Sequence, residues 1–395
     1  MNQAHQSLRD AVAGGAIPGV VAAATDARGS IDEFAVGRRG LPDETAMGGA
    51  AMGGAAMGMD TVFRIASMTK AVTATAAMQL VEQGRLSLDA PAAETVPELG
   101  AVQVLDGFDA DGAPLLRAPR SPVTLRQLLT HTAGFGYETW NPALGAYAKA
   151  RNVPPARTGK LAALAMPLAF DPGTAWQYGI NIDWAGRMVE AASGLDLETY
   201  FRRHVCGPLG MDDTSFLVSP SMEARLAVVH AREGAALTPV AATVNAPREF
   251  FNGGGGLYST PRDYLRFLRM MLGGGSLEGV RLLRAETVAL MGQNHIGALE
   301  VQPMVSAMPA LSNTFEAFPG MVKKWGLSFL INTEDNPGGR KAGSLAWAGL
   351  NNTYFWIDPA SGLAGLVMAQ VLPFGDATVL GLLDAYEKGV YRGRG

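Results

Sequence analysis

Ser67 and Lys70 stand three residues apart in the run Ser67-Met68-Thr69-Lys70, and their side chains could form a nucleophile and its base. On the first turn of a helix, such residues share one face, so a neutral lysine amine could accept the serine proton. The positive end of the helix dipole disfavours a protonated lysine, and the free N–H groups there could hold an oxyanion. The pair alone is weak evidence, because an N-cap serine followed by a solvated lysine has the same spacing.

Further segments follow in the order of a known family. Phe63–Lys70 resembles the nucleophile segment of class C β-lactamases and, more closely, that of family VIII carboxylesterases. Leu125–Phe135 resembles the helix-to-loop segment that comes next in that family, and Phe170–Gly179 resembles the segment that carries its catalytic tyrosine. Asn252–Thr260 resembles a Gly-rich lead into a later helix. The resemblance spans about residues 5–390 and implies a β-lactamase-like serine hydrolase.

By this resemblance, Tyr178 is the second element of the base system, and a phenolate held between two cations could receive and return the Ser67 proton. The alternative for Tyr178 is a partly buried aromatic side chain after a Pro-Gly turn. The resemblance also places residues 347–350 on a strand beside the nucleophile. There Gly349 would let the substrate carbonyl approach, and the backbone N–H groups of Ser67 and Leu350 would form the oxyanion hole.

Two departures from the β-lactamase pattern concern the substrate. Trp347 occupies the position of a lysine that β-lactamases use toward a substrate carboxylate, although a tryptophan could also be an ordinary core residue of the strand. Ile180 stands where these enzymes have an asparagine that holds the substrate amide, and Asn181 comes one position later, which redirects its side chain. With Gly349, these three residues are the candidate substrate contacts. The departures favour a neutral ester as the substrate.

Other chemistries find no support in the sequence. There is no Gly-x-Ser-x-Gly elbow, and the five histidines have no metal-binding spacing, so we expect neither a Ser-His-Asp triad nor a metal or other cofactor. We expect His131 to be a hydrogen-bonded structural residue below the groove. The net charge is −4 and no block of like charges occurs, which argues against a nucleic-acid partner. The single cysteine, Cys206, forms no intrachain disulfide, and we expect it to be buried.

Hydrophobic periodicity and turn residues predict the elements that position these residues. Helices are expected at residues 2–14, 70–83, 125–129, 262–268 and 378–391, and strands at 20–24, 61–66, 325–331, 345–357 and 362–371. The Met/Gly/Ala-rich stretch 46–59 is predicted to be a surface loop that could overhang the site.

These elements predict an α/β (α+β) fold with two lobes, similar to β-lactamases. We expect residues 1–84 and 291–395 to form an antiparallel sheet flanked by helices, and residues 85–290 to form a mainly helical lobe. The catalytic groove would then lie between the lobes, where polar residues from distant parts of the chain converge.

The resulting prediction is a serine carboxylesterase that hydrolyses short-chain or small hydrophobic esters through an acyl-enzyme on Ser67, with weak β-lactam hydrolysis as a side activity. A β-lactamase or D-amino-acid peptidase, or an acyltransferase that uses an alcohol instead of water, would use the same residues. A remote alternative is a non-catalytic ligand-binding or sensor module. No window holds the roughly 20 apolar residues of a membrane span, and no signal sequence is recognised, so we expect a cytoplasmic enzyme without a membrane partner.

Overall fold

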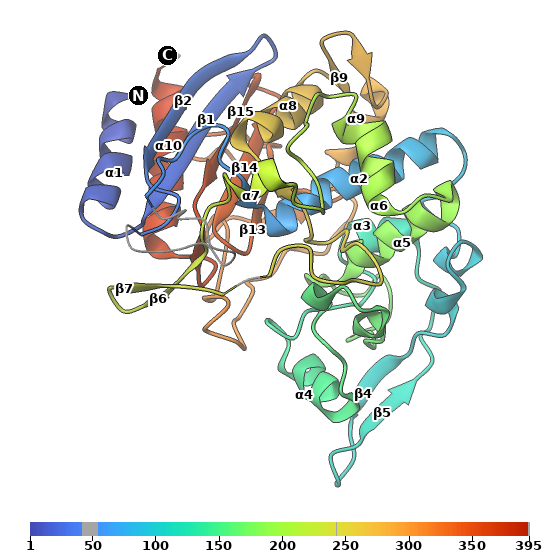
Figure 1. Ribbon diagram of the computed structural model, residues 1–395. Coiled ribbons are helices and arrows are strands. Elements are labelled where there is room, and N and C mark those ends of the chain that lie inside the picture. Colours follow the sequence, from blue (N-terminus) through green and yellow to red (C-terminus); the bar gives the residue numbers. More distant parts are fainter. Residues whose placement is uncertain (42–53, 242, 394–395) are drawn as a thin grey trace.

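Seven antiparallel strands from both ends of the chain form one sheet in the computed structural model, which describes residues 1–41, 54–241 and 243–393 (Figure 1). The N-terminal strand β1 lies inside this sheet, between β15 and β2. The predicted antiparallel sheet built by both chain ends is therefore confirmed. In sheet order, the strands are β11 (Lys323–Trp325), β12 (Leu330–Asn332), β13 (Leu345–Gly349), β14 (Thr353–Asp358), β15 (Leu363–Met368), β1 (Gly19–Asp26) and β2 (Ser30–Gly37).

Helices cover both faces of this sheet (Figure 1). On one face, α1 (Asn2–Ala13) packs against α10 (Ala377–Arg392), which also contacts β15. On the other face, α8 (Pro261–Leu272) packs on β1 and β15. Every residue of β1 is consequently buried, and its sequence is a nearly continuous run of small and apolar residues, as expected for a strand covered on both faces.

The helix that follows the candidate nucleophile is buried nearly all round. In α2 (Thr69–Glu82), the residues from Thr69 to Leu80 are buried, and the helix packs against α5 (Asn181–Ser193). A helix with small and apolar residues on every side belongs inside the protein, and its start is held firmly by the packing. Gly84, at φ +68°, ends the helical segment as its position in the sequence predicts.

The remaining strands lie outside the seven-stranded sheet. The other helices are α3 (Leu125–Leu129), α4 (Pro142–Arg151), α6 (Leu197–Phe201), α7 (Pro220–Glu223) and α9 (Ala285–Met291). The strands are β3 (Phe63–Arg64), β4 (Val104–Phe108), β5 (Pro114–Arg117), β6 (His230–Glu233), β7 (Ala236–Pro239), β8 (Tyr258–Ser259), β9 (Ser276–Leu277), β10 (Val280–Arg281) and β16 (Val371–Leu372). Single turns of 3₁₀ helix span Ala66–Met68, Ala92–Glu94, Pro97–Gly100, Ala156–Thr158 and Leu161–Leu164, and a π-helix spans Arg202–Cys206.

Four predicted strands differ from the structure, and one of them, 362–371, ends at Met368 in β15, while Val371 begins β16 in another sheet. The run 325–331 contains the turn between β11 and β12, where Ser328 adopts φ +76°, and the run 345–357 is the hairpin of β13 and β14. The run 61–66 shortens to β3, which pairs with β8, because the chain turns at Ala66. Apolar continuity across a tight hairpin hides the turn, which explains the errors at 325–331 and 345–357.

The predicted loop 46–59 lies mostly outside the described residues, and its described part, 54–59, contains no helix or named strand. The division at residues 84 and 290 stays a prediction, although α8, inside the segment assigned to the helical lobe, packs on the sheet. No helix in the described part of the chain is both long and apolar enough to cross a membrane. Cys206 is buried, as expected.

Candidate active site

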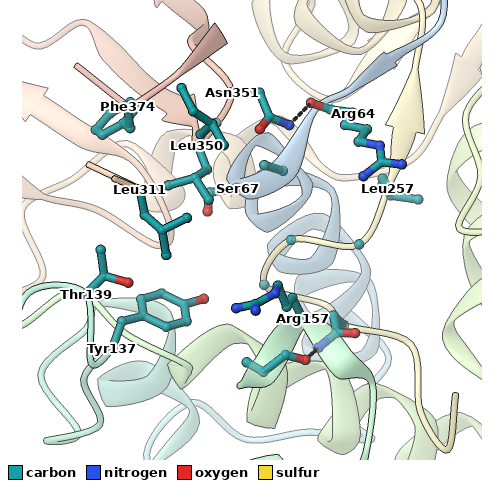
Figure 2. A pocket seen from close by; sticks show the side chains of 18 of the residues that line it. Arg64, Ser67, Tyr137, Thr139, Arg157, Leu257, Leu311, Leu350, Asn351 and Phe374 are labelled. Atoms are coloured by element: carbon teal, nitrogen blue, oxygen red, sulfur yellow. Dashed lines mark hydrogen bonds between the residues drawn. The ribbon is translucent and has the colours of Figure 1, made fainter. Parts of the chain in front are cut away.

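A cavity of about 690 Å³ opens above Ser67, between the end of β13 and the loops at residues 137–140, 156–159 and 252–258 (Figure 2). Tyr178, Trp347, Gly349 and Leu350 also line it. Residues that lie up to 310 positions apart in the sequence, from Arg64 to Phe374, thus meet at one site. Of the sequence-predicted site residues, Lys70 lies directly beneath the cavity, and Ile180 and Asn181 do not line it.

Local backbone geometry presents Ser67 to this cavity. Ser67 is the middle residue of the 3₁₀ turn Ala66–Met68, and Ala66 before it has φ +43°, a conformation that is costly for a residue with a side chain. The turn is held in place because the Thr69 hydroxyl donates to the Ala66 carbonyl at 2.6 Å and accepts from the Leu257 N–H at 3.1 Å. The predicted helix start is therefore a sharp turn followed by α2.

Lys70 is fully buried, and its amine contacts the nucleophile. Its Nζ lies 3.1 Å from Ser67 Oγ, 3.1 Å from the hydroxyl of Tyr137 and 2.6 Å from the carbonyl oxygen of Gly254. Burial lowers the pKa of Lys70 from 10.5 to about 7, against the opposing effect of the Asp183 carboxylate. A substantial fraction of the amine is therefore neutral near pH 7, as a general base requires.

Tyr178 lies between Ser67 and Trp347. The indole Nε1 of Trp347 donates to the Tyr178 hydroxyl at 3.0 Å, and the rings are 4.8 Å apart. Burial raises the pKa of Tyr178 above its usual value, although hydrogen bonds with Ser67 and Trp347 oppose this shift. The phenolate expected from the resemblance is therefore disfavoured, because Trp347 supplies a neutral donor where a second cation would be needed. Lys70 is the member of this group that can lose its proton near neutral pH.

The end of β13 lies directly against the nucleophile turn. A Cβ added to Gly349 would meet the Ile65 carbonyl oxygen at 2.2 Å and Thr353 Oγ1 at 2.3 Å, so only glycine permits this approach. Leu350, the next residue, lies beside Ser67 in Figure 2. Within the described residues, its backbone N–H makes no hydrogen bond, which leaves it available to a ligand.

Ile180 and Asn181 do not fit the predicted role of substrate contacts. Both are almost fully buried, and the side chain of Asn181 points away from the cavity. Its Nδ2 donates to His131 Nδ1 at 2.9 Å and to the Phe135 carbonyl at 2.8 Å. The one-residue shift places this amide at the start of α5, where it fastens the helix to the segment below the groove. His131 is buried, its pKa is lowered by burial, and its ring packs 4.7 Å from that of Tyr178, consistent with a structural residue.

Two residues of the site were missed by the sequence reasoning. Tyr137 comes two positions after the Leu125–Phe135 segment, and its hydroxyl accepts from Lys70. Asp183 lies in the first turn of α5, and its Oδ1 accepts the Gly254 N–H at 2.9 Å, which directs the Gly254 carbonyl toward Lys70. A carboxylate five residues after the candidate tyrosine was the available signal, but spacing alone does not show that it faces a lysine 113 positions earlier.

A family model described as Beta-lactamase matches residues 4–386. The chain belongs to this family. The match confirms the predicted β-lactamase-like α/β fold, and together with the relatives it identifies the chain as an enzyme of the serine hydrolase/acyltransferase type. No group of three or more His, Cys, Asp or Glu side chains in the described ranges is arranged to hold a metal ion.

Relatives with assigned activities include both transferases and an esterase. The chain is 34% identical to monacolin J acid methylbutanoyltransferase of Aspergillus terreus, over 98% of this chain and 94% of that protein. It is 32% identical to lovastatin esterase of Penicillium rubens, over 98% and 97% of the two chains. A solved structure of a simvastatin synthase mutant from Aspergillus terreus superposes with a TM-score of 0.84 at 33% identity, covering 99% of this chain and 96% of that chain. Membership in family VIII remains a prediction.

Proposed function

We propose that this enzyme transfers a short, branched acyl group from an ester or thioester through Ser67 to a hydroxyl group on a bulky apolar acceptor, with hydrolysis as the competing reaction. The observation that carries the proposal is the size of the cavity above Ser67, about 690 Å³. Pockets of about 300–1,000 Å³ hold drug-sized ligands, so this one has room for more than a short acyl chain. The size of the cavity therefore favours an acyltransferase, which must hold an acyl acceptor as well, over an esterase for small esters.

The relatives support the same choice. The relative from Aspergillus terreus is a methylbutanoyltransferase for monacolin J acid, and a relative from Penicillium citrinum is a methylbutanoyltransferase for ML-236A carboxylate. We infer a substrate pair of the same kind here: a methylbutanoyl-sized acyl group and a larger acceptor that carries a hydroxyl group.

Acylation then follows from the contacts of Ser67. The neutral Lys70 amine takes the Ser67 proton as Oγ attacks the acyl carbonyl carbon, and the N–H groups of Ser67 and Leu350 stabilise the negative oxygen that forms. When the tetrahedral intermediate collapses, the bond to the leaving group breaks, and the leaving alkoxide or thiolate takes the proton from Lys70. In this proposal Tyr178 remains a phenol beside Ser67, held there by the hydrogen bond from Trp347.

Deacylation uses the same groups in reverse order. The acceptor hydroxyl loses its proton to Lys70 as its oxygen attacks the acyl-Ser67 carbonyl, and Ser67 Oγ takes a proton back from Lys70 as it leaves. Water competes for the same position. A bulky acceptor that fills the cavity favours transfer, because it excludes water and holds its hydroxyl close to the acyl carbon.

Esterase activity is the second candidate, favoured by the similarity to lovastatin esterase. The two activities share the acyl-enzyme and differ in the second acceptor, so one experiment separates them. Incubation with p-nitrophenyl 2-methylbutanoate and monacolin J acid is expected to yield more acylated acceptor than free 2-methylbutanoate, measured by liquid chromatography. If free acid is the sole product and the acceptor leaves p-nitrophenol release unchanged, the enzyme is an esterase.

The same assay tests whether Ser67 is the nucleophile. Ser67→Ala removes Oγ and leaves the fold intact, so both transfer and hydrolysis are expected to disappear while the melting temperature stays near that of the wild type. Retention of most activity by this variant would contradict acyl transfer through Ser67. A trapped acyl group on Ser67, detected by mass spectrometry after a short reaction, is the positive counterpart.

A further inference from the structure

Three arginines line the cavity: Arg64, Arg157 and Arg248. In the described ranges, none of their guanidinium groups forms an ion pair with a carboxylate. The Asp183 carboxylate, which also lines the cavity, is buried and bonded to the Gly254 N–H. The Arg64 guanidinium stacks over the ring of Tyr258, its partner on β8, at 5.6 Å from the ring centre. The cavity wall therefore carries more positive charge than its own acidic residues neutralise.

Arg157 and Arg248 come from two loops that are fastened to each other. The Gly159 carbonyl accepts the N–H groups of Glu249 at 2.7 Å and of Phe250 at 3.2 Å. Gly159 has φ +66°, and a Cβ there would meet Arg248 Cβ at 2.7 Å, so the two backbones lie in direct contact. This attachment brings the two arginines to one side of the cavity as a pair.

The nearby carboxylate does not neutralise the pair. Glu249 Oε2 accepts the Leu161 backbone N–H at 2.7 Å, and no salt bridge to an arginine forms within the described residues. Figure 2 shows Arg157 reaching into the cavity from the side opposite Leu350. Arg248 Nε donates to the Ala246 carbonyl at 3.4 Å, and its guanidinium lies over the Phe251 ring at 5.5 Å. Among the described residues, the other nitrogens of this guanidinium form no hydrogen bond.

Apolar side chains lie on the side of the cavity across from Arg157. Leu311, Leu350 and Phe374 lie there, together with the polar residues Thr139 and Asn351 (Figure 2). An acyl chain would bury its surface against the apolar side, and the acceptor, which must approach Ser67 from elsewhere, would lie over Arg157. The cavity thus has two chemically different halves that meet at the nucleophile.

We propose that Arg157 and Arg248, here called the cationic rim, bind a carboxylate carried by the acyl acceptor. This inference rests on the proposed transferase function and assigns residues to the recognition of its acceptor. Planar guanidinium groups match the geometry of a carboxylate and form paired, charge-assisted hydrogen bonds with it. The neutral Trp347 on β13 is compatible with this assignment, because it faces Tyr178 and the reacting acyl group, whereas the cationic rim lies on separate loops.

The experiment compares one acceptor with and without its charge. Transfer from the neutral donor p-nitrophenyl 2-methylbutanoate is measured to monacolin J acid and to its methyl ester, for the wild type, Arg157→Gln and Arg248→Gln. Because hydrogen bonds to charged groups contribute about 1.5–3 kcal/mol, the wild type should prefer the acid by roughly tenfold or more in kcat/KM. Each variant should lose most of this preference, through a higher KM for the acid, with its rate for the methyl ester unchanged.

Arg151→Gln is the matched control, because Arg151 is exposed at the end of α4 and does not line the cavity. This variant should behave as the wild type with both acceptors. Hydrolysis of the donor without acceptor should also stay within about twofold in all variants, since acylation does not use the cationic rim. Equal kcat/KM for the acid and the methyl ester in the wild type, or an equal loss for both in the rim variants, overturns the proposal.

Failure of the transferase function gives a different result. In that case, neither acceptor is acylated by any variant, while donor hydrolysis by Ser67 continues. Inhibition of this hydrolysis then tests the cationic rim by itself: monacolin J acid should inhibit the wild type at a concentration roughly tenfold lower than it needs for Arg157→Gln. Equal inhibition constants for the two proteins overturn the assignment of the cationic rim.

Discussion

At the scale of single residues, the site depends on placing an amine where water cannot reach it. Lys70 is surrounded by protein on all sides, and burial lowers its pKa to about 7, whereas Asp183 limits the shift. As a neutral amine, Lys70 has two N–H donors, which the Gly254 carbonyl and the Tyr137 hydroxyl can accept, so its lone pair is left for the Ser67 proton. Burial therefore sets the charge of the Lys70 amine, and its two hydrogen-bond acceptors set the orientation of its lone pair.

This arrangement predicts a pH dependence of acyl-enzyme formation. Lys70 acts in its neutral form, so kcat/KM for p-nitrophenyl 2-methylbutanoate should be low at acidic pH, rise through a pH of about 7 and then level off. The sign follows because a lowered lysine pKa extends the range of the neutral amine downward. Stopped-flow measurement of the p-nitrophenol burst between about pH 5 and about pH 9, a range that brackets the titration of Lys70, checks this pH dependence. A flat profile would show that the base is not titrating in this range.

Tyr137→Phe is the matched variant for this profile, because it removes only the hydroxyl that accepts from Lys70. An ammonium group with one acceptor fewer is less stable, so the rising limb should move to lower pH. The plateau should fall by about tenfold, since the amine is oriented less well toward Ser67. Tyr137 is thus a positioning residue, and a lower plateau with an unmoved limb would indicate a role in the cavity wall instead.

At the scale of the elements, catalysis depends on the close approach of β13 to the turn that carries Ser67. The sheet brings β13 to this turn, and Gly349 permits the contact with Ile65 because it has no side chain. Leu350, the residue after Gly349, then lies beside Ser67 (Figure 2). In the proposed mechanism the oxyanion hole needs both elements, so a small displacement of the strand would affect the chemistry more than the fold.

Gly349→Ala tests this contact. The added methyl group would overlap the Ile65 carbonyl oxygen, so β13 must shift and the Leu350 N–H moves with it. Since loss of one oxyanion donor costs about 10²–10³-fold in kcat, we expect a fall of about a hundredfold in kcat with a much smaller change in KM.

Gly381→Ala serves as the control for this prediction, because Gly381 lies within α10 and a Cβ there meets no atom within 4 Å. Activity should be unchanged, and the free energy of unfolding should rise by about 0.5–1 kcal/mol, because alanine favours a helix. A Gly349→Ala enzyme with wild-type kcat would mean that Leu350 does not stabilise the oxyanion.

At the scale of the whole molecule, the two chain ends hold the sheet together on which the site is built. Strand β1 lies between β15 and β2, and α1 packs against α10. A buried ion pair adds to this closure: the Arg340 guanidinium, between the Phe318 and Trp356 rings, donates to the Glu387 carboxylate of α10. Both side chains are less than 5% exposed, so each charge depends on the other.

Arg340→Met is therefore expected to lower the free energy of unfolding by about 3–5 kcal/mol, because it leaves the Glu387 carboxylate buried without its partner. Urea denaturation followed by circular dichroism measures this loss. The double variant Arg340→Met/Glu387→Leu should recover most of it, since no unpaired charge remains.

Asp335→Asn, in the exposed pair with Lys341, is the control and should change stability little. The kcat of the folded Arg340→Met protein should stay near that of the wild type, because the pair lies outside the cavity. A stability loss as small as that of the control would mean that the buried pair contributes no more than a surface one.

The sequence by itself determined the pairing of Ser67 with Lys70, the long buried helix that carries Lys70 and the sheet shared by both chain ends. These features depend on local order: a serine and a lysine one helical turn apart, a run of small apolar residues closed by Gly84, and apolar runs at both ends of the chain. The same local pattern predicted β13 and β14 as one strand, because the turn between them interrupts the apolar run for only a few residues.

Only the tertiary structure decided which distant residues complete the site. Tyr137 and Asp183 reach Lys70 through folding, and Asn181 turns toward His131, although its position beside Tyr178 suggested a substrate contact. The pKa of Lys70 is likewise a product of burial by several segments, which no spacing along the chain encodes. Residue order specifies which groups share a helical turn, whereas packing specifies which of them lose water and face one another.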